Sequence, residues 1–129
     1  MPGGEDRGAR HFFPRAVRLT RRQEFTRVFQ RAVRVSEDGL TLLARPNGRD
    51  HPRLGLAISR KHARTIAARN RVKRVVRESF RRHQQRLGGL DIVATSRSGL
   101  DPRDKQALTA VLERLWPELI QRCERSSSF

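Results

Sequence analysis

The chain has 129 residues, of which 29 are lysine or arginine and 13 are aspartate or glutamate, giving a formal net charge of +16 at pH 7. Its 36% hydrophobic residues can build one modest core, and its 33% charged residues leave no run of about 18 apolar residues such as a membrane span requires. So large a charge predicts a polyanionic partner, either a nucleic acid or an anionic membrane surface.

The single cysteine, Cys123, excludes an internal disulfide and a cysteine-based zinc site, and is typical of a reducing cytoplasm. The first residues include acidic side chains and no apolar stretch, so no secretory signal is predicted. We therefore expect a cytoplasmic protein with a disordered basic tail over residues 1–11, one domain over residues 12–122 and a disordered tail over residues 123–129.

The first ordered element is predicted to be a short helix that begins at Thr20, because Thr20 and Gln23 have the spacing of a capping box. Apolar side chains then recur at helical spacing, at Phe25, Val28, Phe29 and Ala32. By pattern alone, this stripe favours a face buried in the core.

Alternating apolar residues predict strands after this helix. One strand begins at Leu40 and ends at a turn over residues 46–48, and another covers residues 54–59. We expect these two strands to pair in antiparallel fashion. A further strand is predicted over residues 90–96.

A long helix is predicted over residues 64–87, since apolar side chains recur there with a helical period and the opposite arc is cationic. Gly88 and Gly89 are expected to end it. Its predicted core face consists of Val72, Val75, Val76, Phe80 and Leu87.

The last helix is predicted to be capped by Asp101, with Pro102 at its first position, and Pro117 should end or kink it. The elements together indicate an α+β fold of one helix, two or three strands, a helix, a strand and a helix, which with the third strand is the order α-β-β-β-α-β-α. We expect a two-layer sandwich in which a small mixed sheet of about four strands packs against three helices.

The positive charge is concentrated in the middle of the chain, where residues 51–90 contain 12 basic residues and one acidic residue. Arginine supplies 26 of the 29 basic residues, which suits phosphate binding, although a genome rich in arginine codons would give the same bias. On a helix, Arg69, Lys73 and Arg77 lie one turn apart, a spacing of about 6 Å that is comparable to phosphate separations. Asn70 adds a neutral donor and acceptor. The alternative for this segment is a solvated basic face.

The block LGLAISRKHARTIAARNRVKRVVRESF, Leu54 to Phe80, resembles the strand, basic turn and RNR-motif helix of the bacterial ribonuclease P protein component. FPRAVRLTRRQEFTRVFQ, Phe13 to Gln30, is similar to the N-terminal segment of that family, so the resemblance covers about residues 12–120. It implies a subunit that binds the ribonuclease P RNA, the catalytic RNA that removes the 5′ leader from precursor tRNA. It also implies a left-handed βαβ crossover, which periodicity would not predict.

The resemblance also implies which residues bind RNA. The leader is expected to lie in a cleft between the first helix and the sheet, where Leu43 replaces an aromatic residue common in relatives, and Ala32 replaces a common glycine. Leader contacts are expected at Arg21, Phe25, Phe29 and Leu43. Contacts to the ribonuclease P RNA are expected at Arg60, Lys61 and Arg64 in the basic turn, and at Arg69, Asn70, Arg71, Lys73, Arg74 and Arg77 in the helix.

A self-sufficient nuclease would need an acid–base pair or a carboxylate cluster for metal ions, whereas the 13 acidic residues are scattered and the four histidines share no ligand spacing. We therefore expect no catalytic or metal-binding residue in the protein, with Mg²⁺ bound mainly by the RNA subunit. The expected partners are ribonuclease P RNA and precursor tRNA, and neither a membrane nor DNA. The alternatives are a structural rRNA-binding protein and a DNA-binding regulator that inserts its basic helix in a major groove.

Overall fold

A computed structural model describes residues 15–125 of the chain. The tail predicted over residues 1–11 and the serine-rich end, residues 126–129, lie outside the described residues. The elements are, in chain order, the 3-10 turn η1 (Arg15–Val17), α2 (Arg22–Gln30), β1 (Val33–Glu37), β2 (Leu40–Pro46), β3 (Arg53–Ala57), α3 (Ile66–Leu87), β4 (Leu90–Ser96) and α4 (Lys105–Arg125). Within the described part of the chain, no helix combines the length and the apolar character needed to cross a bilayer.

The four strands form one mixed sheet in the order β1-β2-β4-β3. β2 pairs antiparallel with both β1 and β4, and β3 pairs parallel with β4, so β3, α3 and β4 form a βαβ unit. The expected α+β class with a mixed four-stranded sheet and three helices is confirmed.

The predicted antiparallel pairing of the strand at residues 40–45 with the strand at residues 54–59 is wrong, because β4 lies between them. β4 carries Ile92, Val93 and Ala94 in succession, and all three are fully buried. Successive residues of a strand point to opposite faces of the sheet, so such a run favours a central strand covered on both sides.

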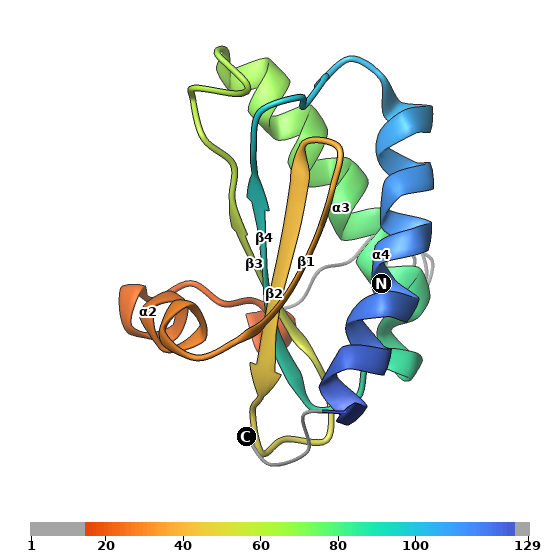
Figure 1. The fold of residues 1–129 in the computed structure, drawn as a ribbon. Coiled ribbons are helices and arrows are strands. Elements are labelled where there is room, and N and C mark those ends of the chain that lie inside the picture. The colour runs from red at the N-terminus through yellow and green to blue at the C-terminus, as the bar shows by residue number, and fades with distance from the viewer. Residues whose placement is uncertain (1–14, 126–129) are drawn as a thin grey trace, which may run out of the picture.

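The helices divide between the two faces of the sheet, with α2 on one side and α3 and α4 on the other (Figure 1). The main core lies between the sheet and the α3–α4 pair, and the predicted core face of α3 is confirmed. A smaller cluster lies beneath α2 and contains Leu19, Val28, Leu43 and Val93. α4 anchors α3 through a buried hydrogen bond, in which the indole Nε1 of Trp116 donates to the Ser79 hydroxyl at 2.7 Å.

The two predicted N-caps, Thr20 and Asp101, are not the observed ones. The N-cap of α2 is Arg21 instead of Thr20, and the carboxylate of Glu24 accepts the backbone N–H groups of both residues at 3.0 Å. α4 is capped by Asp104, whose carboxylate accepts the N–H of Ala107 at 3.0 Å. In both helices a carboxylate further along the chain accepts backbone N–H groups at the helix start, those of the N-cap and the residue before it in α2, and that of the third helical residue in α4.

The C-terminal end of α4 lies further along the chain than predicted. The helix continues through Pro117 to Arg125, so this proline does not end it, and the helix extends three residues beyond the domain end expected at residue 122. Leu115, Trp116 and Leu119 are buried on both sides of the proline, and this packing holds the helix across the missing N–H. The predicted end of α3 at Gly88 is confirmed, where φ is +57°, a value that glycine adopts without strain.

Candidate nucleic-acid interface

The cationic residues predicted on α3 lie on its solvent-facing side. Val72, Val75 and Val76 are buried against the sheet and α4, which turns the opposite side of the helix outward. Arg69 and Lys73 are half-buried, whereas the exposed members of the set are Asn70, Arg71, Arg74 and Arg77. We refer to these six residues as the cationic face.

The turn that leads from β3 to α3 adds three more exposed cations, Arg60, Lys61 and Arg64. Arg69 ties this turn to the helix, because its Nη1 donates to the carbonyl oxygens of Ala63 at 3.1 Å and of Arg64 at 3.2 Å. The guanidinium of Arg69 therefore positions the turn as well as adding charge, a role that its place in the motif did not predict.

Positive charges also crowd one another near the middle of α3. Although much of the Arg77 side chain is exposed, partial desolvation of its guanidinium lowers its pKa, and the neighbouring charges of Arg18 and Arg74 lower the pKa further. Arg18 comes from the segment after η1, far from α3 in the sequence. Its proximity extends the positive field of the cationic face, and a bound phosphate would relieve this repulsion.

The predicted leader residues are distributed between the surface and the core. Arg21 is exposed, and Phe29 is 46% exposed, an unusual fraction for so large an apolar side chain. Phe25 is half-buried and packs closely over Gly55, where an added Cβ would lie only 2.6 Å from the Phe25 Cζ. Leu43 is only 2% exposed and packs beneath α2, so its side chain supports the helix and is not available at the surface.

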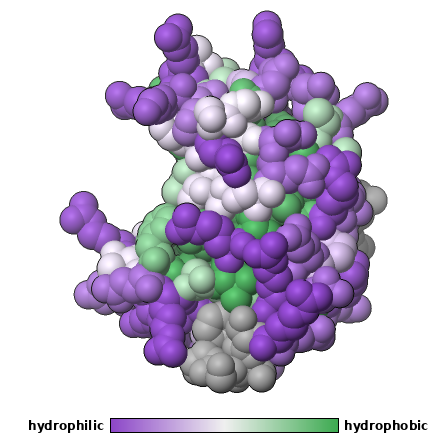
Figure 2. Space-filling model, in the orientation of Figure 1, coloured by the Kyte–Doolittle hydropathy of each residue, from purple (hydrophilic) through white to green (hydrophobic). Residues whose placement is uncertain are grey.

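Beyond α2, the described part of the chain places no further helix over this face of the sheet (Figure 1). A row of small side chains crosses the strands here. It begins with Ser36 on β1, which pairs with Thr41 on β2, and the hydroxyls of these two residues lie 2.8 Å apart. Thr95 and Ala57 continue the row on β4 and β3. Figure 2 shows this side of the molecule hollowed between α2 and the upper, hydrophilic part of the protein. Exposed Phe29, Arg21 on α2 and a hydroxyl-bearing floor suit an unpaired strand.

A buried ionic network holds α2 on the sheet. Arg53 forms two parallel hydrogen bonds with the carboxylate of Asp91, at 2.8 and 2.7 Å, and a third with Glu24 at 3.0 Å. Arg53 and Asp91 are 8% and 3% exposed. The bond to Asp91 is the main cause that raises the pKa of Arg53, whereas backbone N–H donation, first from Arg21, lowers the pKa of Glu24. No motif in the sequence predicted this network.

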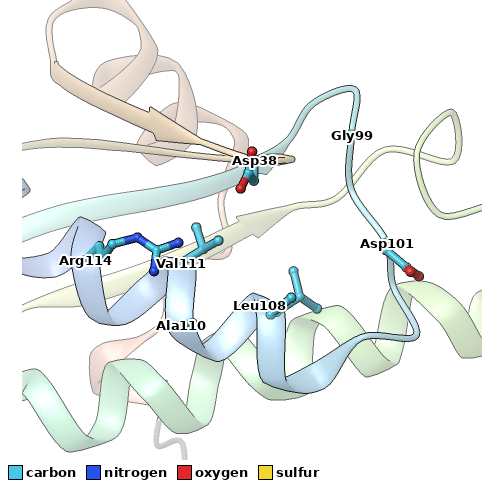
Figure 3. Close-up of a pocket in the computed structure, with 8 residues that line it drawn as sticks. Asp38, Gly99, Asp101, Leu108, Ala110, Val111 and Arg114 are labelled. Atoms are coloured by element: carbon cyan, nitrogen blue, oxygen red, sulfur yellow. The ribbon is translucent and has the colours of Figure 1, made fainter.

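A second hollow, of about 240 Å³, lies between the β1–β2 turn, the loop before α4 and α4 itself. Asp38, Asp101 and Arg114 line it, but the carboxylate of Asp101 points away from Asp38 (Figure 3). Arg114 is already bonded to Glu37, at 2.6 Å from its Nε. Over residues 15–125, no three histidine, cysteine or acidic side chains gather as possible metal ligands.

The fold and its two surfaces define a small α+β protein with a basic helix suited to nucleic acid. A sequence model of the ribonuclease P family matches residues 13–120. The ribonuclease P protein component of Methylococcus capsulatus is 48% identical, and the alignment covers 94% of this chain and 94% of that protein. The ribonuclease P protein component of Pseudoalteromonas atlantica is 46% identical, over 88% of this chain and 95% of that protein.

Solved structures agree with these relatives. The Staphylococcus aureus RNase P protein superposes with a TM-score of 0.74 at 25% identity, over 81% of this chain and 95% of that one. The Thermotoga maritima RNase P protein superposes with a TM-score of 0.67 at 33% identity, over 81% of this chain and 96% of that one. The chain belongs to the bacterial ribonuclease P protein component family. It is therefore the protein part of a tRNA-processing ribonucleoprotein enzyme, and its partner is the ribonuclease P RNA.

Proposed function

We propose that the protein binds the ribonuclease P RNA through the cationic face and the β3–α3 turn. The observation that carries this assignment is the gathering of nine predicted contact residues on one helix and the turn tied to it, with their charged groups mostly exposed. Arginine forks bind phosphates in two-pronged geometry, and each phosphate contact releases counterions, so the binding should be strongly salt-dependent.

We further propose that the surface formed by α2 and the open sheet binds the 5′ leader of precursor tRNA. Phe29 and Phe25 offer ring faces to unpaired bases, and Arg21 offers a charge to the backbone. The Arg53–Asp91–Glu24 network supports this surface because it fixes α2 against the sheet. A structural rRNA-binding protein or a DNA-binding regulator would account for the basic helix but not for this second surface.

In this proposal the RNA carries out the phosphodiester chemistry, and the protein binds substrate and stabilises the ribozyme. The described residues offer no cluster of ligands that fits Mg²⁺, so we assign the magnesium ions to the RNA. We place this activity in the cytoplasm, where precursor tRNA is processed and where a lone cysteine stays reduced.

Lys73→Ala and Arg74→Ala are each expected to weaken binding to ribonuclease P RNA and to reduce the slope of log affinity against log salt by about 0.7 to 0.9. Each variant removes one phosphate contact from the cationic face. Filter binding or fluorescence titration at several salt concentrations measures the slope. Arg86→Ala, at the far end of the same helix, is the matched control and should leave the slope unchanged. Equal slopes for all four proteins would show that the cationic face is merely solvated.

A further inference from the structure

We propose that a hollow at the start of α3 binds one unpaired nucleotide of the partner RNA, an inference that rests on the proposed binding of ribonuclease P RNA. The hollow has a volume of about 580 Å³ and lies between the first turns of α3 and the loop that leads from β4 to α4. These two segments lie at the top of the molecule in Figure 1. They are about 30 residues apart in the sequence, so no single motif spans the hollow.

Three arginines line the hollow, Arg64 and Arg71 from the turn and α3, and Arg103 from the loop. Among residues 15–125, the guanidinium groups of Arg64 and Arg71 have no hydrogen-bond or ion-pair partner, so they are available to a ligand. Asp101 is the acidic residue of the lining, and it is occupied by the loop itself, since its carboxylate accepts the N–H of Arg103 at 3.0 Å and lies 3.8 Å from the Arg103 Nε. The lining is therefore positive, which favours a phosphate.

Apart from Thr65, the rest of the lining consists of apolar side chains and an imidazole ring. Ala68, Leu100 and Pro102 contribute apolar surface, and the ring of His62 lies beside them. His62 is fixed in place, because its Nδ1 lies 2.9 Å from the hydroxyl of Ser96. A bare phosphate would make no use of such a surface, whereas an unpaired base stacks on flat apolar and imidazole groups while its phosphate meets the arginines.

The hollow is also preformed and continuous with the cationic face. The two hydrogen bonds from Arg69 hold the turn that carries Arg64, and the hydroxyl of Thr65 accepts the N–H of Ala68 at 2.9 Å. Little ordering is therefore needed on binding. Arg71 belongs to both surfaces, so an RNA backbone that follows the cationic face leads directly to the hollow.

Ala68→Glu is the sharpest variant, because it adds bulk and negative charge to the hollow without harming the helix. Thr65 is the N-cap of α3 and residue 68 is its third helical position, where glutamate completes a capping box. The variant should fold at least as stably as wild type, as thermal unfolding will show. We expect its affinity for ribonuclease P RNA to fall by about tenfold or more, since a carboxylate there repels phosphate.

Arg103→Ala is the second variant, and we expect about tenfold weaker binding with a salt slope reduced by about 0.7, the value for a contact to a single strand. Arg86→Ala is again the matched loss of one positive charge. Each full-length protein is also bound to ribonuclease P RNA and probed by acylation of 2′-hydroxyls. One unpaired nucleotide that wild type protects should become reactive in both hollow variants, while the remaining protections persist.

Wild-type affinity and an unchanged footprint in Arg103→Ala and in folded Ala68→Glu would overturn the hollow as a binding site, and the proposed function would stand if Lys73→Ala still weakened binding. If Ala68→Glu failed to fold, Arg103→Ala would decide alone. Failure of the wild-type protein to bind ribonuclease P RNA would instead overturn the proposed function, and the hollow with it.

Discussion

Asp91→Ala is expected to lower the free energy of unfolding by about 3–5 kcal/mol, the usual cost of leaving one partner of a buried ion pair uncompensated. The substitution removes both hydrogen bonds that Asp91 forms with Arg53, and it removes the carboxylate oxygen that accepts from Asn47 at 3.0 Å. Glu24 alone would then face a guanidinium that is almost completely buried. Urea unfolding followed by circular dichroism measures the loss.

Glu37→Ala is the matched control, because Glu37 forms an ion pair with Arg114 at the surface of the protein. Exposed pairs of this kind contribute little to stability, so this variant should unfold at nearly the wild-type urea concentration. A loss of less than about 1 kcal/mol for Asp91→Ala would contradict the account, because it would mean that Arg53 is not desolvated. Arg53→Met with Asp91→Leu should recover most of the loss by replacing the charges with apolar groups.

Phe29→Ala is expected to weaken binding of precursor tRNA to the holoenzyme by about 1–3 kcal/mol, which is the contribution of one stacked base. Affinity for mature tRNA should stay nearly unchanged, because mature tRNA has no leader. Phe29 is 46% exposed, so the loss of folding stability should remain well below the roughly 3–5 kcal/mol of a buried phenylalanine. Equilibrium binding measures the affinities for precursor and mature tRNA, and thermal unfolding of the variant measures its folding stability.

Two controls separate stacking from packing at this position. Phe29→Leu keeps an apolar side chain at this position but removes the ring, so it should show the same selective loss for precursor tRNA. Phe80→Ala removes a fully buried ring of the main core and should lower stability and both affinities together. A stable Phe29→Ala protein that retains the wild-type ratio of precursor to mature affinity would remove Phe29 from the leader site.

The elements could be predicted from the sequence where local patterns are strong. The core face of α3, its end at Gly88 and the bounds of β4 follow from periodicity and from glycine, and each depends on residues near one another in the chain. Strand pairing could not be predicted in this way, because it depends on which strand is buried on both faces and so takes the centre of the sheet. The N-caps differ from the predicted ones because other carboxylates accept backbone N–H groups at the helix starts. Glu24 accepts those of Thr20 and Arg21 in α2, and Asp104 accepts that of Ala107 in α4.

The candidate site divides in the same way. The cationic face could be predicted because its residues share one helix, and the RNR pattern marks them. The positions of Arg18, Arg53 and Arg103 could not be predicted, because each depends on segments that are distant in the sequence. Arg18 lies near Arg77 of α3, Arg53 pairs with Asp91, and Arg103 lines the same hollow as Arg71. Leu43 was expected at the surface because the family resemblance implied a leader contact there, but its side chain packs in the cluster beneath α2.

The most direct test of the proposed function is cleavage of precursor tRNA by a bacterial ribonuclease P RNA at low Mg²⁺, with and without this protein. We expect cleavage at the mature 5′ end to depend on the protein under these conditions, and rigorously RNA-free protein to show no turnover. The full-length chain and a leader-bearing substrate are used throughout, with Arg86→Ala protein as the charge control. Equal cleavage with and without the protein, or turnover by the protein alone, would contradict the account.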